Sequence, residues 1–193
     1  MVIIVNKILF NRDSIELKEI RELIEKQSHR CLVLWVIDCA PRVISIFEKR
    51  YPNDLRPREA FNATILWSKG EIKMPVARRA ALDAHKAASD VNDDLAACAA
   101  AHAMGHVLGT VHVETHAMGL MMYGLTALVL NAPIKDRQKV IECETQIFYD
   151  RLKFWESETD KEERKWASFL LKNDVPNKEK ILREKLTTKK ANL

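Results

Sequence analysis

Histidine is the residue type whose spacing points most clearly to chemistry in this sequence. Four of the six histidines, His102, His106, His112 and His116, lie close together in the second half of the chain. The pairs 102/106 and 112/116 are each four residues apart, so each pair would share one face of an α-helix. Two imidazoles at that spacing can chelate one metal ion. We therefore treat these four histidines as candidate ligands of a divalent metal such as zinc.

The neighbouring residues argue against one form of that chemistry. A zinc protease of the HExxH type needs Glu directly after its first His, to act on the bound water, and this chain has Ala103 there. On a straight helix His112 would lie about 240° around from His106, at about 100° per residue, so the two pairs could share one site only if the chain turns between them. Carboxylates or a further imidazole to complete a ligand set are available at Asp38, Asp83, His85 and Glu114.

Two readings without a metal stay open for the same histidines. In the commoner one, partly buried imidazoles on Ala/Gly-rich helices bond to carbonyl or carboxylate oxygens and serve the fold alone. In the other, they act as general acids or bases. Gly105 and Gly109 have the GxxxG spacing that lets another helix approach closely, which favours a packing role for this stretch.

A second group of candidate functional residues is charged. Arg side chains can bind carboxylates or phosphates through two hydrogen bonds at once, although more often they form ion pairs within the protein. The candidate polar set consists of Asp38, Arg42, Arg56, Arg58, Asp83, His85 and Glu114. The phosphate-loop patterns GxxxxGK[ST] and GxGxxG are absent, as is the GxSxG elbow of hydrolases, which weakens the enzyme hypothesis without closing it, and we assign no catalytic residue.

Composition favours a helical globular protein. Of 193 residues, 47% are apolar and 30% charged, and five Gly and six Pro are too few for a loop-rich β protein. The formal charge of +4 is the small difference between 31 basic and 27 acidic residues, so no preference for nucleic acid follows. The cysteines lack CxxC spacing, which indicates reduced, buried thiols in a cytoplasmic protein. They are Cys31, Cys39, Cys98 and Cys143.

The helices must position these side chains, and we expect an all-α, single-domain bundle of about eight to nine helices. The predicted helices cover about 15–27, 29–50, 57–70, 75–89, an alanine-rich segment capped by Asn92 or Asp93, 117–130, a segment after Pro133, 161–172, and a segment after Pro176. Pro41 predicts a kink or short break in the second of these. The run 117–130 is too short to span a membrane, so it should form, with the alanine-rich segment, a buried central helix pair. Whether those two are continuous stays open.

Spaced Trp, Asp, Arg and His residues give the chain a family resemblance. They include Trp35, Asp38-Cys39-Ala40, Arg42-Val43, Pro52, Asp54, Arg56-Pro57-Arg58, Trp67, Gly70, Arg78, Ala84-His85, Gly105-His106, Thr110, His112, His116-Ala117 and Tyr123. With them the chain resembles a family of bacterial helical proteins labelled putative immunity proteins of polymorphic toxin systems. The resemblance covers about residues 31 to 155, and residues 1–30 and 156–193 are extensions outside it.

The resemblance implies a protein that binds a cognate protein toxin and holds it inactive, with no cofactor and no reaction of its own. Two other functions stay open. One is a metal-dependent all-α enzyme, such as a hydrolase, that uses the clustered histidines with a nearby carboxylate. The other is a helical scaffold that forms a homodimer through its largest apolar patch.

Overall fold

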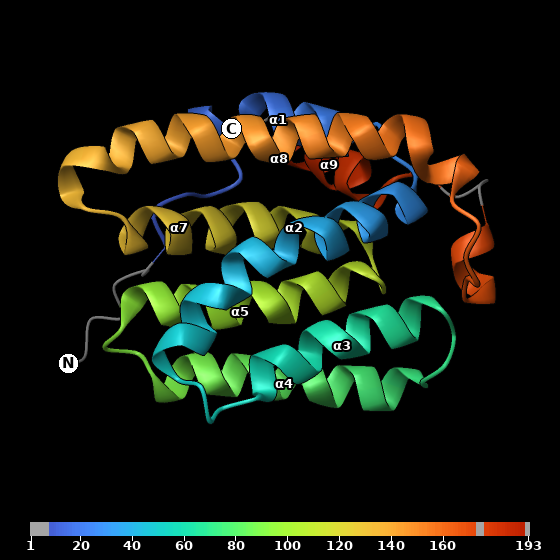
Figure 1. Ribbon diagram of the computed structural model, residues 1–193. Helices are drawn as coiled ribbons and strands as arrows, with labels where there is room; N and C mark the ends of the chain where they lie inside the picture. Colours follow the sequence, from blue (N-terminus) through green and yellow to red (C-terminus); the bar gives the residue numbers. More distant parts are fainter. Residues whose placement is uncertain (1–7, 173–175, 192–193) are drawn as a thin grey trace.

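An alanine-rich helix, α5 (Leu95–Thr110), lies at the centre of the protein. In the computed structural model, which describes residues 8–172 and 176–191, four helices pack against it (Figure 1). These are α2 (His29–Arg50), α3 (Arg56–Ser68), α4 (Met74–Asp90) and α7 (Leu125–Asn131). The described residues contain no β-strand, which confirms the predicted all-α class.

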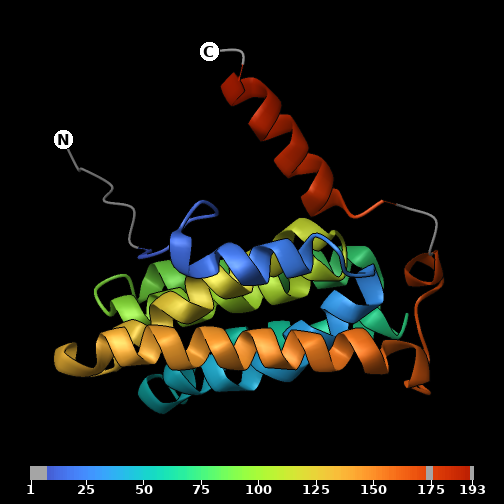
Figure 2. The same cartoon turned by 90° about the horizontal axis from the view of Figure 1, so that it is seen from above.

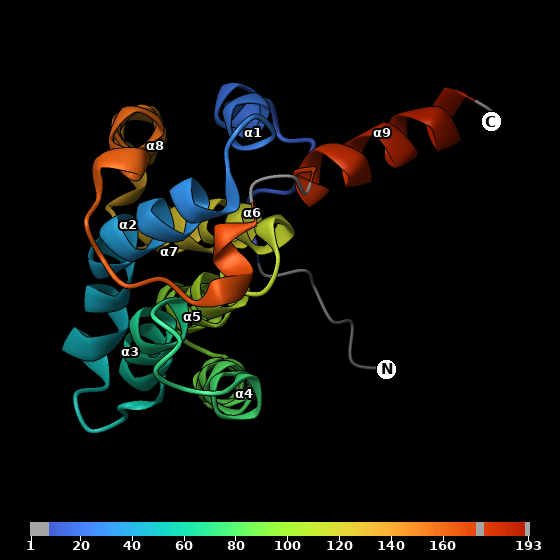
Figure 3. The ribbon, with the colours of Figure 1, turned by 90° about the vertical axis from the view of Figure 1, so that its right-hand side faces the viewer.

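A further layer covers α2 and α7. Helix α8 (Arg137–Glu158) packs across both, and α1 (Lys18–Ile24) lies beside α8, as the end view in Figure 3 shows. Helix α9 (Lys178–Ala191) extends away from the body of the protein (Figure 2). Short 3₁₀ segments at Ile15–Leu17, Ile134–Asp136, Thr159–Lys161 and Ser168–Leu171 join these elements. None of the helices in the described part is long and apolar enough to cross a membrane.

Small side chains explain why α5 can occupy the centre. Its alanines are all buried, and a helix that is apolar on every side can be surrounded by others. Asp94 caps its start by accepting a hydrogen bond from Ala97 N, so the cap lies one residue beyond the predicted Asn92 or Asp93.

The chain turns after α5, which answers the question that the sequence left open. The helix ends at Thr110, and the chain returns through a 3₁₀ turn, Glu114–His116, and a short helix, α6 (Ala117–Gly119). A π-helical stretch, Leu120–Gly124, then leads into α7. The predicted central helix pair is therefore formed by α5 and the returning segment, and most of the returning segment is buried.

Helix α2 runs through Pro41 as one helix, so of the kink or short break that we predicted, the break is absent. Its side chains before and after the proline, including Trp35 and Phe47, are fully buried and fix both halves against the rest of the bundle. Trp35 also donates a hydrogen bond from Nε1 to the carbonyl oxygen of Phe148 in α8, at 2.9 Å. Packing thus outweighs the loss of one helical hydrogen bond.

The segment 161–172 is not the α-helix that its composition predicted. After Thr159–Lys161 the chain leaves helical geometry and crosses back over the end of α3, where Ala167 N donates to the carbonyl oxygen of Ser68 at 2.8 Å. Arg164 donates to the Ser68 hydroxyl at the same distance.

The prediction that all four cysteines are buried is wrong for one of them. Cys143 is exposed, while Cys31, Cys39 and Cys98 are buried.

Candidate functional site

Four histidines from three elements form one continuous row of rings. His85 of α4 and His102 of α5 meet with their Nδ1 atoms 2.9 Å apart. One turn further along α5, the Nδ1 atoms of His106 and His116 are 3.1 Å apart. Tyr123 packs on two of these rings, with its centroid 5.2 Å from that of His102 and 5.0 Å from that of His106. We call the four histidines the histidine stack.

Three glycines provide the space for this stack. A Cβ atom at Gly105 would lie 2.5 Å from Nε2 of His85, one at Gly109 would lie 2.7 Å from Cγ of His116, and one at Gly119 would lie 2.2 Å from Cγ of His106. Real Cβ atoms essentially never approach other heavy atoms so closely. The GxxxG spacing of Gly105 and Gly109 therefore makes room for imidazole rings, and not only for a neighbouring helix as the sequence suggested.

The histidines of the stack are held in their neutral form. Burial lowers the pKa of all four, that of His102 to about 4 and that of His106 to about 3, where the charge of His116 adds to the effect. A hydrogen bond between two Nδ1 atoms needs a proton on one ring and a lone pair on the other. Each of the two pairs therefore shares a single proton, and a second proton would break the contact.

The predicted metal-ligand set is only partly brought together. His102, His106 and His116 belong to the stack, but His112 faces the other way and stacks on Trp67, with ring centroids 6.1 Å apart. Across residues 8–172 and 176–191, no three His, Cys, Asp or Glu side chains are arranged to hold a metal ion. Metal binding by these histidines stays a prediction.

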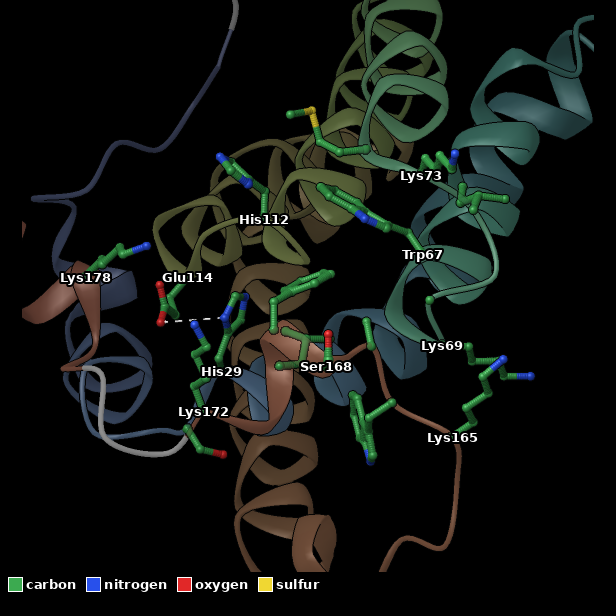
Figure 4. A pocket seen from close by; sticks show the side chains of 18 of the residues that line it. His29, Trp67, Lys69, Lys73, His112, Glu114, Lys165, Ser168, Lys172 and Lys178 are labelled. Carbon is green, nitrogen blue, oxygen red and sulfur yellow. Dashed lines mark ion pairs between the residues drawn. The ribbon is translucent and has the colours of Figure 1, made fainter.

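His112 instead borders a pocket of about 830 Å³ at one end of the bundle (Figure 4). The apolar part of its lining includes Trp67, Ile72, Met74, Trp166, Phe169 and Leu170. Five lysines also line it, Lys69, Lys73, Lys165, Lys172 and Lys178. We call this the basic pocket. Its walls come from the bundle on one side and from the segment 165–172, with the start of α9, on the other.

One buried carboxylate lies in the basic pocket. Glu114 is only 4% exposed, and its Oε1 is 3.7 Å from Nδ1 of His29 (Figure 4). His29 Nε2 lies 2.6 Å from the carbonyl oxygen of Thr110, which can only accept, so the ring proton is on Nε2. Burial lowers the pKa of His29, whereas the Thr110 carbonyl and the Glu114 carboxylate act in the opposite direction. Glu114 Oε2 has no hydrogen-bond partner in the described residues.

The candidate polar set does not form one site. Asp38 accepts from Arg151 and Trp155, Arg42 pairs with Glu144, Arg56 with Asp54 and Asp90, Arg58 with Glu48, and Asp83 with Arg79. These pairs are spread over several helices, and most of them join one helix to another, whereas Arg79 and Asp83 lie in the same helix. Only two members reach the features described above, His85 in the histidine stack and Glu114 in the basic pocket.

Sequence reasoning missed most of the basic pocket. Its lysines are scattered from position 69 to position 178, and three of the five belong to a C-terminal extension to which we assigned no role. The position of Tyr123 beside the histidines could have been predicted. It lies seven residues after His116 in an apolar run, and residues at that spacing share one face of a helix. Nothing comparable marked His29.

The architecture is thus an all-α bundle with a buried histidine stack inside and a basic pocket at one end. A family model described as "Imm-5 like putative immunity protein" matches residues 22–152, which is more than half of the chain, and the chain belongs to this family. The match begins within α1, earlier than the predicted position 31, and ends within α8. No curated protein and no solved structure matches the chain.

Proposed function

We propose that this protein binds a cognate protein toxin in the cytoplasm and holds it inactive, without catalysing a reaction. The observation that carries the proposal is the family match over residues 22–152, which covers all the central helices. An immunity protein that acts by binding needs a rigid surface and no chemistry of its own.

The arrangement of the histidines supports binding over catalysis. In the stack, each Nδ1 atom is hydrogen-bonded to the ring of its partner histidine, and the three facing glycines leave space for the rings only where they lie. In the basic pocket, His29 is bonded to a backbone carbonyl and His112 is stacked on Trp67. A general base needs a nitrogen that can reach a substrate, so these partners favour structural roles for the imidazoles.

Expression with a toxin tests the proposal. The protein encoded by the neighbouring gene should be produced together with this chain carrying an affinity tag, and the purified material should be analysed by size-exclusion chromatography with light scattering. We expect a stable complex that persists in EDTA, and growth of cells that the neighbouring protein alone would kill. If no complex forms and growth is not restored, the proposal is contradicted.

A further inference from the structure

The basic pocket combines an apolar wall with an excess of positive charge. Trp67 is buried, stacks on His112 and contacts the tilted ring of Phe169, with centroids 6.1 and 5.8 Å away. Phe169 and Met74 are 40% and 50% exposed, so apolar surface remains open to a partner. An apolar centre with a charged rim is the usual anatomy of a protein–protein interface.

The charges in the basic pocket are strongly unequal. Five lysines line it against one carboxylate, Glu114, which is itself buried. None of these lysines forms an ion pair with another described residue, whereas arginines elsewhere on the bundle are mostly paired. Glu71 lies between Lys69 and Lys73 in the sequence but does not line the pocket. Unpaired lysines around an apolar wall favour an acidic partner.

Helix geometry adds to this preference. Helix α2 begins at the pocket with Ser28 and His29, α4 with Lys73 and Met74, and α9 with Asn177 and Lys178. The start of an α-helix carries a partial positive charge of roughly half a unit, because its first N–H groups lack helical partners. Three such helix starts border the same pocket. The side chains of Ser28 and Asn177 already accept hydrogen bonds from N–H groups at the starts of α2 and α9, so the uncapped start of α4 contributes most to this preference.

One wall of the basic pocket lies outside the family match. Lys165, Trp166, Phe169 and Lys178 come after residue 152, where the match ends, whereas Trp67 and His112 lie within it. Ala167 N holds the outer wall in place through its hydrogen bond to Ser68 O. The pocket therefore joins a part common to the family with a part supplied by this chain's own C-terminal extension.

We infer that the basic pocket docks an acidic segment of the toxin, in which carboxylates flank an apolar anchor residue, and that the C-terminal extension sets which toxin is accepted. This inference rests on the proposed function. The apolar anchor lies against Trp67 and Phe169, and the flanking carboxylates meet the lysines. Glu114 restricts the deepest position to a neutral or donor group.

A charge-reversal pair tests the inference. The Lys73→Glu, Lys165→Glu double variant places a reversal on each wall of the pocket. The matched control is Lys135→Glu, Lys139→Glu, in the 3₁₀ segment before α8 and the first turn of α8, neither of which lines the pocket. The start of α8 lies at the opposite end of the bundle from the segment 165–172 (Figure 1). Each pair changes the formal charge from +4 by four units, so both variants have a net charge of zero. Thermal melting followed by circular dichroism establishes that both variants fold.

The first probe is a labelled peptide of Asp and Glu with one central Trp, measured by fluorescence anisotropy. We expect binding that weakens with salt, a loss of about tenfold or more in the pocket variant, and a change of less than about twofold in the control. Equal binding of the matched Asn/Gln peptide, equal losses in the two variants, or no binding by the unaltered protein would overturn the inference. Binding of a short RNA but not of the acidic peptide would also overturn it.

The second probe separates this inference from the proposed function. If the unaltered protein and the pocket variant bind the neighbouring gene's product equally well, toxin binding stands and the basic pocket is not its site. If the peptide binds as expected but the neighbouring protein forms no complex with the unaltered chain, the pocket recognises acidic segments and the proposed function fails. Loss of both peptide and toxin binding in the pocket variant alone is the expected result.

Discussion

The ring of His106 fills the space that a side chain at position 119 would need, since a Cβ atom built on Gly119 would lie 2.2 Å from Cγ of His106. The atoms that this Cβ would meet include Cβ and Cγ of His106, which lie close to the α5 backbone. A rotation of the imidazole ring therefore cannot relieve the contact. Two different helical segments therefore depend on each other at this point.

Substitution of Gly119 by Ala should lower the free energy of unfolding by about 3 kcal/mol, because overpacking a closed interior forces the backbone to shift. Urea unfolding followed by circular dichroism measures this change. Gly105→Ala should cost less, since the atoms it meets are at the far end of the His85 side chain and can move. Gly124→Ala is the matched control, with its nearest contacts at 3.1 Å, and should change stability by less than about 1 kcal/mol.

A double variant tests the cause of that loss. In a protein that already carries His106→Ala, the added Gly119→Ala substitution should cost much less than it does in the unaltered protein, because the obstructing ring is gone. Equal costs in both backgrounds would show that Gly119 is needed for another reason.

The stability of the protein should depend on pH through the histidine stack. The folded pKa of His102 is about 4 and that of His106 about 3, both below the ordinary value of 6.5, so between these values the unfolded chain binds more protons than the folded one. The contribution of these histidines to the free energy of unfolding is therefore fully present above pH 6.5 and is lost as the pH is lowered toward 4. Urea midpoints measured from pH 8 to pH 4 test this.

The comparison protein for the pH series is His106→Gln, which lacks one of the titrating groups. Its midpoint should change less between pH 6.5 and pH 5 than that of the unaltered protein. Parallel curves for the two proteins would contradict the assignment of the acid sensitivity to the stack.

Asp38 joins α2 to α8 and should contribute to stability. Its Oδ2 accepts from Arg151 Nε at 2.5 Å and from Trp155 Nε1 at 3.0 Å. Asp38→Ala leaves both donors without their acceptor and should cost about 1–2 kcal/mol in urea unfolding. Asp83→Ala is the control, because among the described residues Asp83 pairs with the exposed Arg79 on the same helix, and should cost less than about 0.5 kcal/mol. Equal effects of the two substitutions would contradict the role of Asp38.

One thiol should react much faster than the others. Cys143 is exposed, whereas Cys31, Cys39 and Cys98 are buried, and burial raises the pKa of Cys31 to about 11. Ellman's reagent should label one equivalent rapidly in the native protein and the remaining three only after unfolding. Cys143→Ser should remove the rapid phase alone, and a rapid phase that persists in this variant would show that a second cysteine becomes accessible.

The helical class and the central position of α5 were predictable, because an alanine-rich segment with few charges can only be a buried helix. The shared face of His102 and His106 followed from their spacing. The turn after Thr110 was not predictable, since residues 111–113 contain neither Gly nor Pro. It is this turn that returns His116 to His106 and sends His112 to Trp67.

Tertiary contacts account for the other differences. The segment 161–172 has the composition of a helix, but residues 162–167 are not helical, and the hydrogen bond from Ala167 N to Ser68 O holds them across the end of α3. His85 reaches His102 only because α4 packs against α5. The basic pocket depends on the first of these contacts and the histidine stack on the second, and local sequence patterns record neither.

A titration of toxin activity tests the central claim most directly. A fixed amount of the neighbouring gene's product is mixed with increasing amounts of this protein, with and without EDTA, and the remaining toxin activity is measured at several times. If this protein acts by binding alone, activity falls linearly to an end point at about one equivalent, independent of time and of EDTA. Complete loss of activity at a small fraction of one equivalent, increasing with time, would mean that the protein turns over its target and would contradict the account.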